Sequence, residues 1–390
     1  MLRNLLLISG ICLIALAGLT QADSLMMRRG LELKGYVKHL HQASFEDRVA
    51  DLHTGDLLHN RMQLRYGFRQ GLSARVDVRN RIFYGEEVRL NPAFAAMLEN
   101  PNDYMDLTRV WYSRGSIIAH TVVDRACVSF TSEKWELTAG RQRINWGVTT
   151  LWTPNDLFNT YNFFDFDYEE RPGSDAVHIQ YSPGGFSALE IAYKAGHHRD
   201  EHIAAMLWRF NRWNFDFQFF GGILNADATA GGGWAGRIGN AGFKGETTVL
   251  IPVMNGTPDS TTAVLGTIMM DYVFTDGWYV SGAYLYNQAG TDAIPSISGF
   301  YVPRLTLRNL MPFRHSWSSM VSKAITPILT ATGVVIYSPA SSTLIAVPSL
   351  NYSIADAWDV YLTGQVFLAK QDSGYGSLGH TIFLRLKVSF

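Results

Sequence analysis

The chain has 390 residues, of which 13% are aromatic and 17% charged, and its formal net charge is −1. The lack of a basic excess argues against general nucleic-acid binding, which depends on neutralising phosphates. The only cysteines are Cys12 and Cys127.

The first residues have the organisation of a secretory signal peptide. Arg3 supplies positive charge, an apolar run extends from Leu5 to Leu19, and the small residue Ala22 ends a cleavage site. We therefore predict a signal peptide over 1–22, with an N-terminal membrane anchor as the alternative. Loss of Cys12 with the leader would leave an exported chain that cannot form an internal disulfide.

The remaining residues, 23–390, are expected to form one domain, because no hinge, linker or low-complexity segment interrupts them. After the leader, no stretch approaches the roughly 20 consecutive apolar residues of a transmembrane helix. An exported, aromatic-rich chain of this kind is either a soluble β protein or an outer-membrane β-barrel.

Alternation of apolar and polar side chains is typical of strands with two different faces. It is clearest over 61–69, 213–220 and 382–390. The apolar faces carry large aromatic residues and the polar faces carry full charges, which favours a transmembrane barrel over a soluble sandwich. The chain ends on Phe390, an ending that resembles the signal that outer-membrane barrels present to their assembly machinery.

Short turns, such as Pro183-Gly184-Gly185, Asn211-Arg212 and Asp276-Gly277, alternate with longer segments along the chain. The longer segments are 44–56, 87–118, 144–173, 195–201, 254–261, 289–313 and 370–379. Short periplasmic turns and long outer loops predict a closed antiparallel transmembrane β-barrel of about 18 strands, provided that 104–116 belongs to a loop. In the glycine-rich stretch 221–243 the pattern does not define one of the hairpins, so a barrel of about 16 strands is the alternative.

Residues 140–175 hold the densest mixture of aromatic and charged side chains. A bulge at Gly140 would turn Arg141 and Arg143 toward the barrel interior. The following segment, 144–173, is rich in large apolar side chains that would be costly to expose together. We therefore expect it to fold into the barrel as a constriction or plug.

Charged residues with inward parity form the candidate pore. The basic members, together with Arg141 and Arg143, are Arg61, Arg65, Arg69, Arg75, Arg79, Arg81 and Arg125. The acidic members are Asp165, Asp167, Glu169 and Glu170. A basic wall opposite an acidic loop would create a transverse field in which polar solutes pass more easily than apolar ones. The alternative is that these charges only lock the loop to the wall.

The segment around Gly140, Arg141, Gln142, Trp146 and Gly147 resembles a family of porin-like outer-membrane proteins of Gram-negative bacteria, many of them without an assigned role. The resemblance covers roughly residues 120–180. It implies outer-membrane location and barrel architecture, but no substrate, so no binding residue is transferred from it.

The sequence thus predicts a channel in the bacterial outer membrane for passive diffusion of small hydrophilic solutes. Expected partners are outer-membrane lipid and lipopolysaccharide, the barrel-assembly machinery through Phe390, and small polar solutes. Two alternatives stay open. One is a non-conducting surface barrel that binds polysaccharide or another envelope component, and the other is a barrel-embedded hydrolase. The oligomeric state is open too.

Neither catalysis nor a cofactor is expected. The chain contains no GxSxG or HExxH motif, which argues against the hydrolase. Asp165, Asp167 and Glu169 alternate as in some calcium loops, but the glycine and the bidentate acid of an EF-hand are missing. No metal ligand or catalytic residue is therefore predicted.

Overall fold

The structure is a computed structural model that describes residues 30–46, 51–68, 71–98, 103–160, 163, 173–198, 200–253, 261–294, 306–372 and 374–390. The predicted signal peptide over 1–22 lies outside these residues and stays a prediction. Within the described part of the chain, none of the helices has the length and apolar character needed to cross a membrane.

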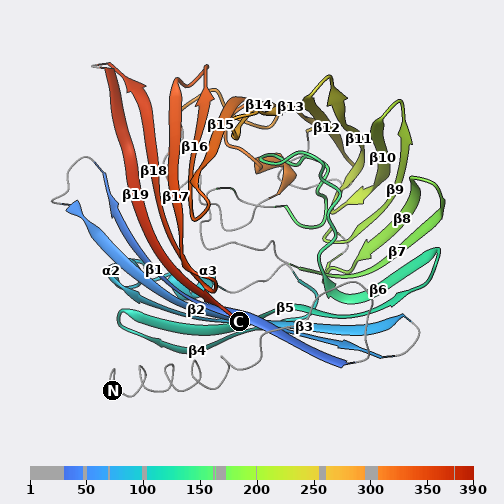
Figure 1. Ribbon diagram of the computed structural model, residues 1–390, viewed down its shortest axis with the longest axis horizontal. Helices are drawn as coiled ribbons and strands as arrows, with labels where there is room; N and C mark the ends of the chain where they lie inside the picture. The colour runs from blue at the N-terminus through green and yellow to red at the C-terminus, as the bar shows by residue number, and fades with distance from the viewer. Residues whose placement is uncertain are drawn as a thin grey trace.

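Each strand of the ring pairs antiparallel with the next ring strand along the chain, and β1 (Gly30–Phe45) pairs with β19 (Gly374–Ser389), which closes the sheet (Figure 1). The other ring strands are β2 (His53–Gly67), β3 (Leu72–Gly85), β5 (Ile117–Thr131), β6 (Trp135–Gln142), β7 (Ser174–Gly184), β8 (Ser187–Lys194), β9 (Ile203–Arg212), β10 (Phe215–Leu224), β11 (Asp227–Ile238), β12 (Ala241–Pro252), β13 (Ala263–Val273), β14 (Trp278–Asn287), β15 (His315–Thr326), β16 (Leu329–Ser338), β17 (Thr343–Ala355) and β18 (Trp358–Gln371). The closed antiparallel barrel of 18 strands is confirmed, and the 16-strand alternative is wrong.

One further strand, β4 (Thr108–Arg114), lies in the long connection between β3 and β5. It pairs with β5 from Ile117 to Val122, whereas β6 pairs with β5 only from Ala126 to Thr131. The segment expected as a loop is therefore outside the ring but not irregular. The short strand β6 leaves part of the β5 edge uncovered, and β4 satisfies the backbone groups there.

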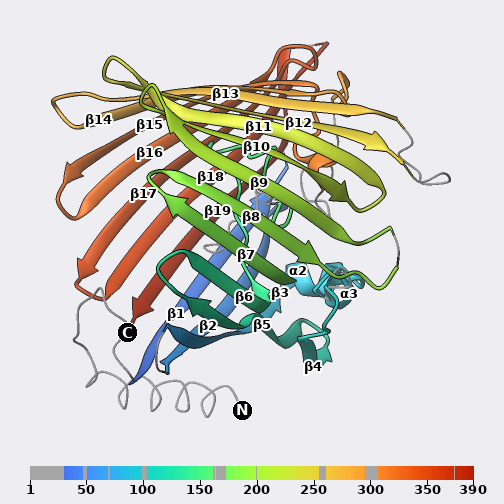
Figure 2. The same ribbon diagram turned by 90° about the vertical axis from the view of Figure 1, so that its right-hand side faces the viewer.

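The two ends of the barrel differ in their connections. The C-terminus lies at the end with short turns, opposite the connection that carries β4, α2 (Glu86–Leu90) and α3 (Phe94–Met97) (Figure 2). The glycine-rich region resolves into β10, β11 and β12, joined by the two-residue turns 225–226 and 239–240.

Two sequence predictions about turns are wrong. Residues 370–379 are not a loop, because only two residues separate β18 from β19, and Gly374, Gly376 and Gly379 lie within β19. The turn expected at Asn211-Arg212 is formed by Trp213 and Asn214, which both have positive φ angles of 55° and 61°. A two-residue hairpin needs such angles at both central positions, so the turn moves there and β10 begins at Phe215.

The outer and inner faces of the sheet follow the predicted alternation. Met62, Leu64 and Tyr66 are exposed on the outer face, as are Ile382, Leu384 and Leu386 near the C-terminus. The inner face is not uniformly polar. The inner residues of β2, β3 and β5 include six arginines and two aspartates, whereas those of several strands from β9 to β18 form an apolar cluster. The barrel interior therefore has one charged side and one apolar side.

The ends of the chain are joined by a close backbone contact. The Gly35 N–H donates to the Phe390 carbonyl at 2.8 Å, and the Phe390 N–H donates to the Gly35 carbonyl at 2.9 Å. A Cβ on Gly35 would lie 2.4 Å from the Arg61 carbonyl oxygen and 2.7 Å from the Phe390 ring. Closure at the β1–β19 seam therefore requires glycine at this position.

We predict that Gly35→Ala weakens closure, because the added methyl group overlaps backbone, a kind of overpacking that costs about 1–3 kcal/mol. The matched control is Gly333→Ala, since a Cβ on Gly333 meets no atom within 4 Å. Urea unfolding, followed by the mobility difference of boiled and unboiled protein on gels, measures the effect. Equal midpoints for the two variants would contradict the role assigned to Gly35.

Candidate channel interior

The described part of the predicted inward loop, residues 144–160, lies inside the ring (Figure 1). Trp146, Trp152 and Phe158 are buried against inner-face residues of the barrel, among them Phe220 and Leu207. The loop therefore packs against the apolar side of the interior. The predicted inward packing is confirmed for these residues, and 161–172, apart from Phe163, lie outside the described part of the chain.

Glu246 of β12 anchors the loop. Its carboxylate accepts hydrogen bonds from the backbone N–H groups of Val148 at 2.5 Å, Thr149 at 2.6 Å and Asn155 at 2.9 Å, and from the Thr149 hydroxyl at 2.6 Å. The residue is only 2% exposed. Four donors on a single buried carboxylate fix the loop backbone against the wall, because each donor would otherwise be left unsatisfied away from water.

A second carboxylate, Glu190 of β8, holds the start of the loop. It accepts a hydrogen bond from the Trp146 indole N–H at 2.8 Å, lies 3.0 Å from His178 Nε2, and forms an ion pair with Arg209. The Gln218 side chain donates to the Trp146 carbonyl at 2.6 Å, so both the ring and the backbone of Trp146 are held.

The close fit of the loop also depends on glycine. The Asn155 side-chain amide donates to the Gly232 carbonyl at 2.9 Å, and a Cβ on Gly233 would lie 3.0 Å from the same amide nitrogen. The glycine run of β11 therefore lets the loop approach the strand backbone.

Sequence reasoning missed Glu190 and Glu246. The available signal was weak but real, since each is a lone inward acid in an otherwise uncharged stretch, SALEIAY and GETTVLI. A buried carboxylate needs several donors, and the strands supply few.

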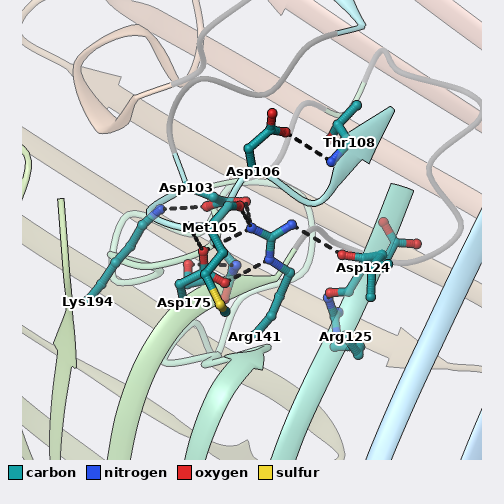
Figure 3. A network of polar contacts seen from close by, with 12 residues as sticks. Asp103, Met105, Asp106, Thr108, Asp124, Arg125, Arg141, Asp175 and Lys194 are labelled. Carbon is teal, nitrogen blue, oxygen red and sulfur yellow. Dashed lines mark hydrogen bonds and ion pairs between the residues drawn. The ribbon is translucent and has the colours of Figure 1, made fainter. Parts of the chain in front are cut away.

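Arg141 stands at the centre of a second polar network, which joins β6, β7, β8 and the segment before β4 (Figure 3). Its guanidinium donates two hydrogen bonds to the Asp175 carboxylate, at 2.8 and 2.9 Å, and lies 3.4 Å from Asp103. Asp103 in turn pairs with Lys194 at 3.1 Å, and Asp175 accepts the backbone N–H of Met105 at 2.7 Å. Arg141 is therefore a buried structural hub.

The bulge predicted at Gly140 is wrong. The pairings of β6 with β5 and with β7 continue through Gly140 without a register shift. Gly140 instead has a φ of 109°, and a Cβ there would lie 2.3 Å from the Ala126 carbonyl oxygen. The local demand for glycine was thus identified correctly, but it comes from backbone conformation and close strand contact.

The charged side of the interior is paired within the wall itself. Arg61 lies 3.1 Å from both Asp77 and Asp124, and Arg79 donates to Asp124 at 2.9 Å. Arg75 donates to Asp77 at 2.8 and 2.6 Å. The two aspartates were not predicted. They act as counterions for the buried arginines, since breaking a buried pair would leave an uncompensated charge.

Other predicted pore residues have different surroundings. Arg81 donates to His120 Nε2 at 2.9 Å, and Arg125 donates to the Asp124 carbonyl at 2.8 Å. Arg65 and Arg143 are exposed, and the Arg75 side chain is 27% exposed. Five predicted members lie outside the described residues, namely Arg69, Asp165, Asp167, Glu169 and Glu170. The opposition of a basic wall and an acidic loop therefore stays a prediction.

Two more connections fold inward. Phe94 of α3 packs against Phe83 with ring centroids 5.1 Å apart, and the turn η3 (Leu307–Asn309) contributes Leu307 to the apolar cluster, followed by Phe313. Among the described residues, no group of three or more His, Cys, Asp or Glu side chains is arranged to hold a metal ion. Three connections therefore narrow the interior. The described residues form no metal centre.

Comparisons with known proteins show the fold. No protein-family model matches the chain, and no curated protein has a significantly similar sequence. Among solved structures, OccAB4 of Acinetobacter baumannii is similar with a TM-score of 0.58 at 10% identity, covering 92% of this chain and 98% of that one. The outer membrane protein OprD of Pseudomonas aeruginosa is similar with a TM-score of 0.57 at 10% identity, covering 92% and 93%. OpdK of Pseudomonas aeruginosa, solved with vanillate, is similar with a TM-score of 0.55 at 11% identity, covering 92% and 99%.

We predict that Glu246→Ala releases the loop, because four donors lose their acceptor and each unsatisfied buried donor costs about 1–3 kcal/mol. Hydrogen exchange at residues 148–155 should then accelerate by more than about tenfold, as measured by mass spectrometry.

The control for this variant is Thr267→Ala. Thr267 is buried directly opposite Glu246 on β13, but its hydroxyl donates to the Tyr284 carbonyl rather than to the loop. Unchanged protection of 148–155 in Glu246→Ala, or equal acceleration in both variants, would contradict the anchoring role.

Proposed function

We propose that the protein is a channel of the bacterial outer membrane for passive diffusion of small hydrophilic solutes, with the loop 144–173 as its constriction. The observation that carries this proposal is the division of the barrel interior. The loop occupies the apolar side, and the charged side is left as the route for polar solutes. The barrels that it resembles include the outer membrane protein OprD.

Accessible charge on the inner wall supports an aqueous route. Arg65 is exposed and Arg75 is partly exposed on the inner faces of β2 and β3, toward the end with short turns. Farther along the same strands, Arg61 and Arg79 are buried in ion pairs with Asp77 and Asp124. We therefore assign Arg65 and Arg75 to solute contact, and Arg61 and Arg79 to the structure of the wall.

The charge balance of this wall favours anions. The inner residues of β2, β3 and β5 include six arginines, which outnumber Asp77 and Asp124. A pore lined by an excess of one sign raises the local concentration of the opposite ion. A modest anion preference follows, and vanillate, which is present in the OpdK structure, is a suitable organic anion to test.

The proposal keeps the expected surroundings of an outer-membrane barrel. Lipid faces the exposed apolar outer wall, and Phe390, at the seam of the barrel, is the contact for the assembly machinery. The protein performs no reaction in this proposal. The non-conducting surface barrel and the embedded hydrolase are the competing functions, and no described arrangement favours either.

Purified protein in planar bilayers should form open channels. In a salt gradient, their reversal potential should have the sign of an anion-selective pore. Arg65→Gln combined with Arg75→Gln should reduce that potential, because both exposed charges are lost. Arg212→Gln is the control, since Arg212 is exposed at a turn and lies against the Trp213 ring. A complete lack of openings would favour the non-conducting barrel.

Cys127 provides a native sensor of the route. It lies opposite Arg75 on the inner face of β5 and is partly exposed. We expect a methanethiosulfonate reagent that carries an ammonium group to lower the single-channel current, because it narrows the route, and to strengthen the anion preference, because it adds cationic charge.

Cys127→Ser is the control and should be insensitive to the reagent. Complete modification, verified by mass spectrometry, without a change in current or reversal potential would show that the solute route does not pass Cys127.

A further inference from the structure

The outer face of the barrel carries hydrogen-bonded tyrosine–histidine pairs with matching geometry. The Tyr193 hydroxyl lies 2.8 Å from His202 Nδ1, and the rings stack with centroids 5.8 Å apart and an interplanar angle of 17°. The Tyr284 hydroxyl lies 2.8 Å from His315 Nδ1, with centroids 6.2 Å apart and an angle of 21°. Two separate hairpins thus build the same polar unit.

Both pairs belong to the lipid-facing side of the sheet. Tyr193 has the parity of the exposed Leu189 and Ile191, and Tyr284 has the parity opposite to the fully buried Leu285. His202 immediately precedes β9, and His315 is the first residue of β15. The pairs therefore lie at the end of the barrel with long connections, away from the C-terminus.

Their height on the barrel is that of a membrane interface. A strand rises about 3.4 Å per residue, which is about 2.6 Å along the axis at a tilt of roughly 40°. Eleven residues separate His202 from Trp213, and ten separate His315 from Ile325. These spacings correspond to about 26–29 Å, close to the roughly 25 Å height of the apolar band.

The opposite interface is built differently. There, Arg212 lies over the Trp213 ring at 5.1 Å and Lys323 over the Trp278 ring at 4.7 Å. Tryptophan with a long cationic side chain is a common interfacial anchor. The histidine pairs therefore distinguish the outer end of the barrel chemically from the other end.

The first pair presents a defined donor. The Tyr193 hydroxyl and the Gly196 N–H, at 3.4 Å, both address His202 Nδ1, so Nδ1 accepts and the ring proton resides on Nε2. In the second pair, the Tyr284 hydroxyl is also hydrogen-bonded to Nδ1 of His315, and the tautomer in which this nitrogen accepts carries its proton on Nε2. In the described residues, no hydrogen bond to either Nε2 is seen. An imidazole N–H at a headgroup interface suits an anionic oxygen acceptor.

We propose that these two pairs bind phosphate groups of the glycolipid that forms the outer leaflet. The neighbouring charges permit this. Arg314 precedes His315 in the chain and lies 3.6 Å from Asp292, with both side chains about half exposed. Near His202, the Glu201 carboxylate is occupied by the backbone N–H groups of His197 and His198, at 3.0 and 3.2 Å.

A third pair provides an internal comparison. His39 and Tyr84 stack at 17°, with His39 Nε2 3.1 Å from the Tyr84 hydroxyl, but Asp56 also lies 3.0 Å from His39 and 2.9 Å from His41. This carboxylate occupies the same imidazole nitrogen as the tyrosine hydroxyl, so that nitrogen is not available to a phosphate. The third pair should therefore not contribute to phosphate binding.

The inference rests on the proposed outer-membrane location. Its test uses the purified full-length protein in detergent with diphosphorylated lipid A, the same lipid without phosphates, and inorganic phosphate. Binding is measured by native mass spectrometry and by the lipid-dependent shift in unfolding temperature. Wild-type protein should prefer the diphosphorylated lipid, and the double variant His202→Gln with His315→Gln should lose at least about tenfold in affinity.

The matched control is His39→Gln, which removes the third imidazole and should leave lipid affinity unchanged. Equal affinity of the wild type and the double variant, or an equal loss in His39→Gln, would overturn the proposal. If the protein bound inorganic phosphate as tightly as the phosphorylated lipid, the ligand of these pairs would be free phosphate, and the assignment to a lipid headgroup would be wrong. Channel recordings on the same samples test the channel proposal separately. If the protein failed to conduct, the comparison of lipid affinities would still test the phosphate site.

Discussion

Closure of the sheet by β1 and β19 is the constraint on which the rest of the structure depends. An open sheet exposes a row of unpaired backbone groups at each edge, which is untenable in an apolar medium. The seam joins strands from the two ends of the described chain, from Tyr36 with Ser389 to Phe45 with His380. Closure also creates an enclosed interior, so every inward side chain must find a partner within a confined space.

The interior meets that requirement in two ways. On the apolar side, inward strand residues bury the aromatic side chains of the loop, and two isolated carboxylates, Glu190 and Glu246, fix its backbone and its first tryptophan. Apolar packing supplies most of the attraction, whereas hydrogen bonds to single acceptors determine the position. The loop is therefore seated as an integral part of the barrel wall.

On the charged side, the arginines are satisfied largely by Asp77 and Asp124, which belong to the same wall. This pairing separates structural from accessible charge along a single strand pair. Arg61 is buried between both aspartates, while Arg65, four residues along β2, is exposed. A row of like residues in the sequence thus divides into two roles, because a buried arginine needs a counterion beside it, whereas an exposed arginine keeps its contact with water.

By itself, the sequence determined the properties that depend on local periodicity. Alternation over 61–69 and 382–390 predicted which side chains face outward, and turn chemistry with loop spacing predicted a ring of about 18 strands. The apolar content of 144–160 predicted inward folding, since such side chains avoid water wherever they lie. Each of these features can be predicted from the sequence of a single strand or segment.

Only the tertiary structure decided which distant groups meet. The partners of Arg61, Arg141 and Glu246 come from other strands or loops, and no spacing along the chain encodes their distance. The same holds for β4, whose pairing depends on the edge left uncovered by a short β6. Periodicity assigns a side chain to a face, but the register of neighbouring strands and the path of the loops select its contacts, because hydrogen bonds and ion pairs form only where the closed sheet brings their atoms within about 3 Å.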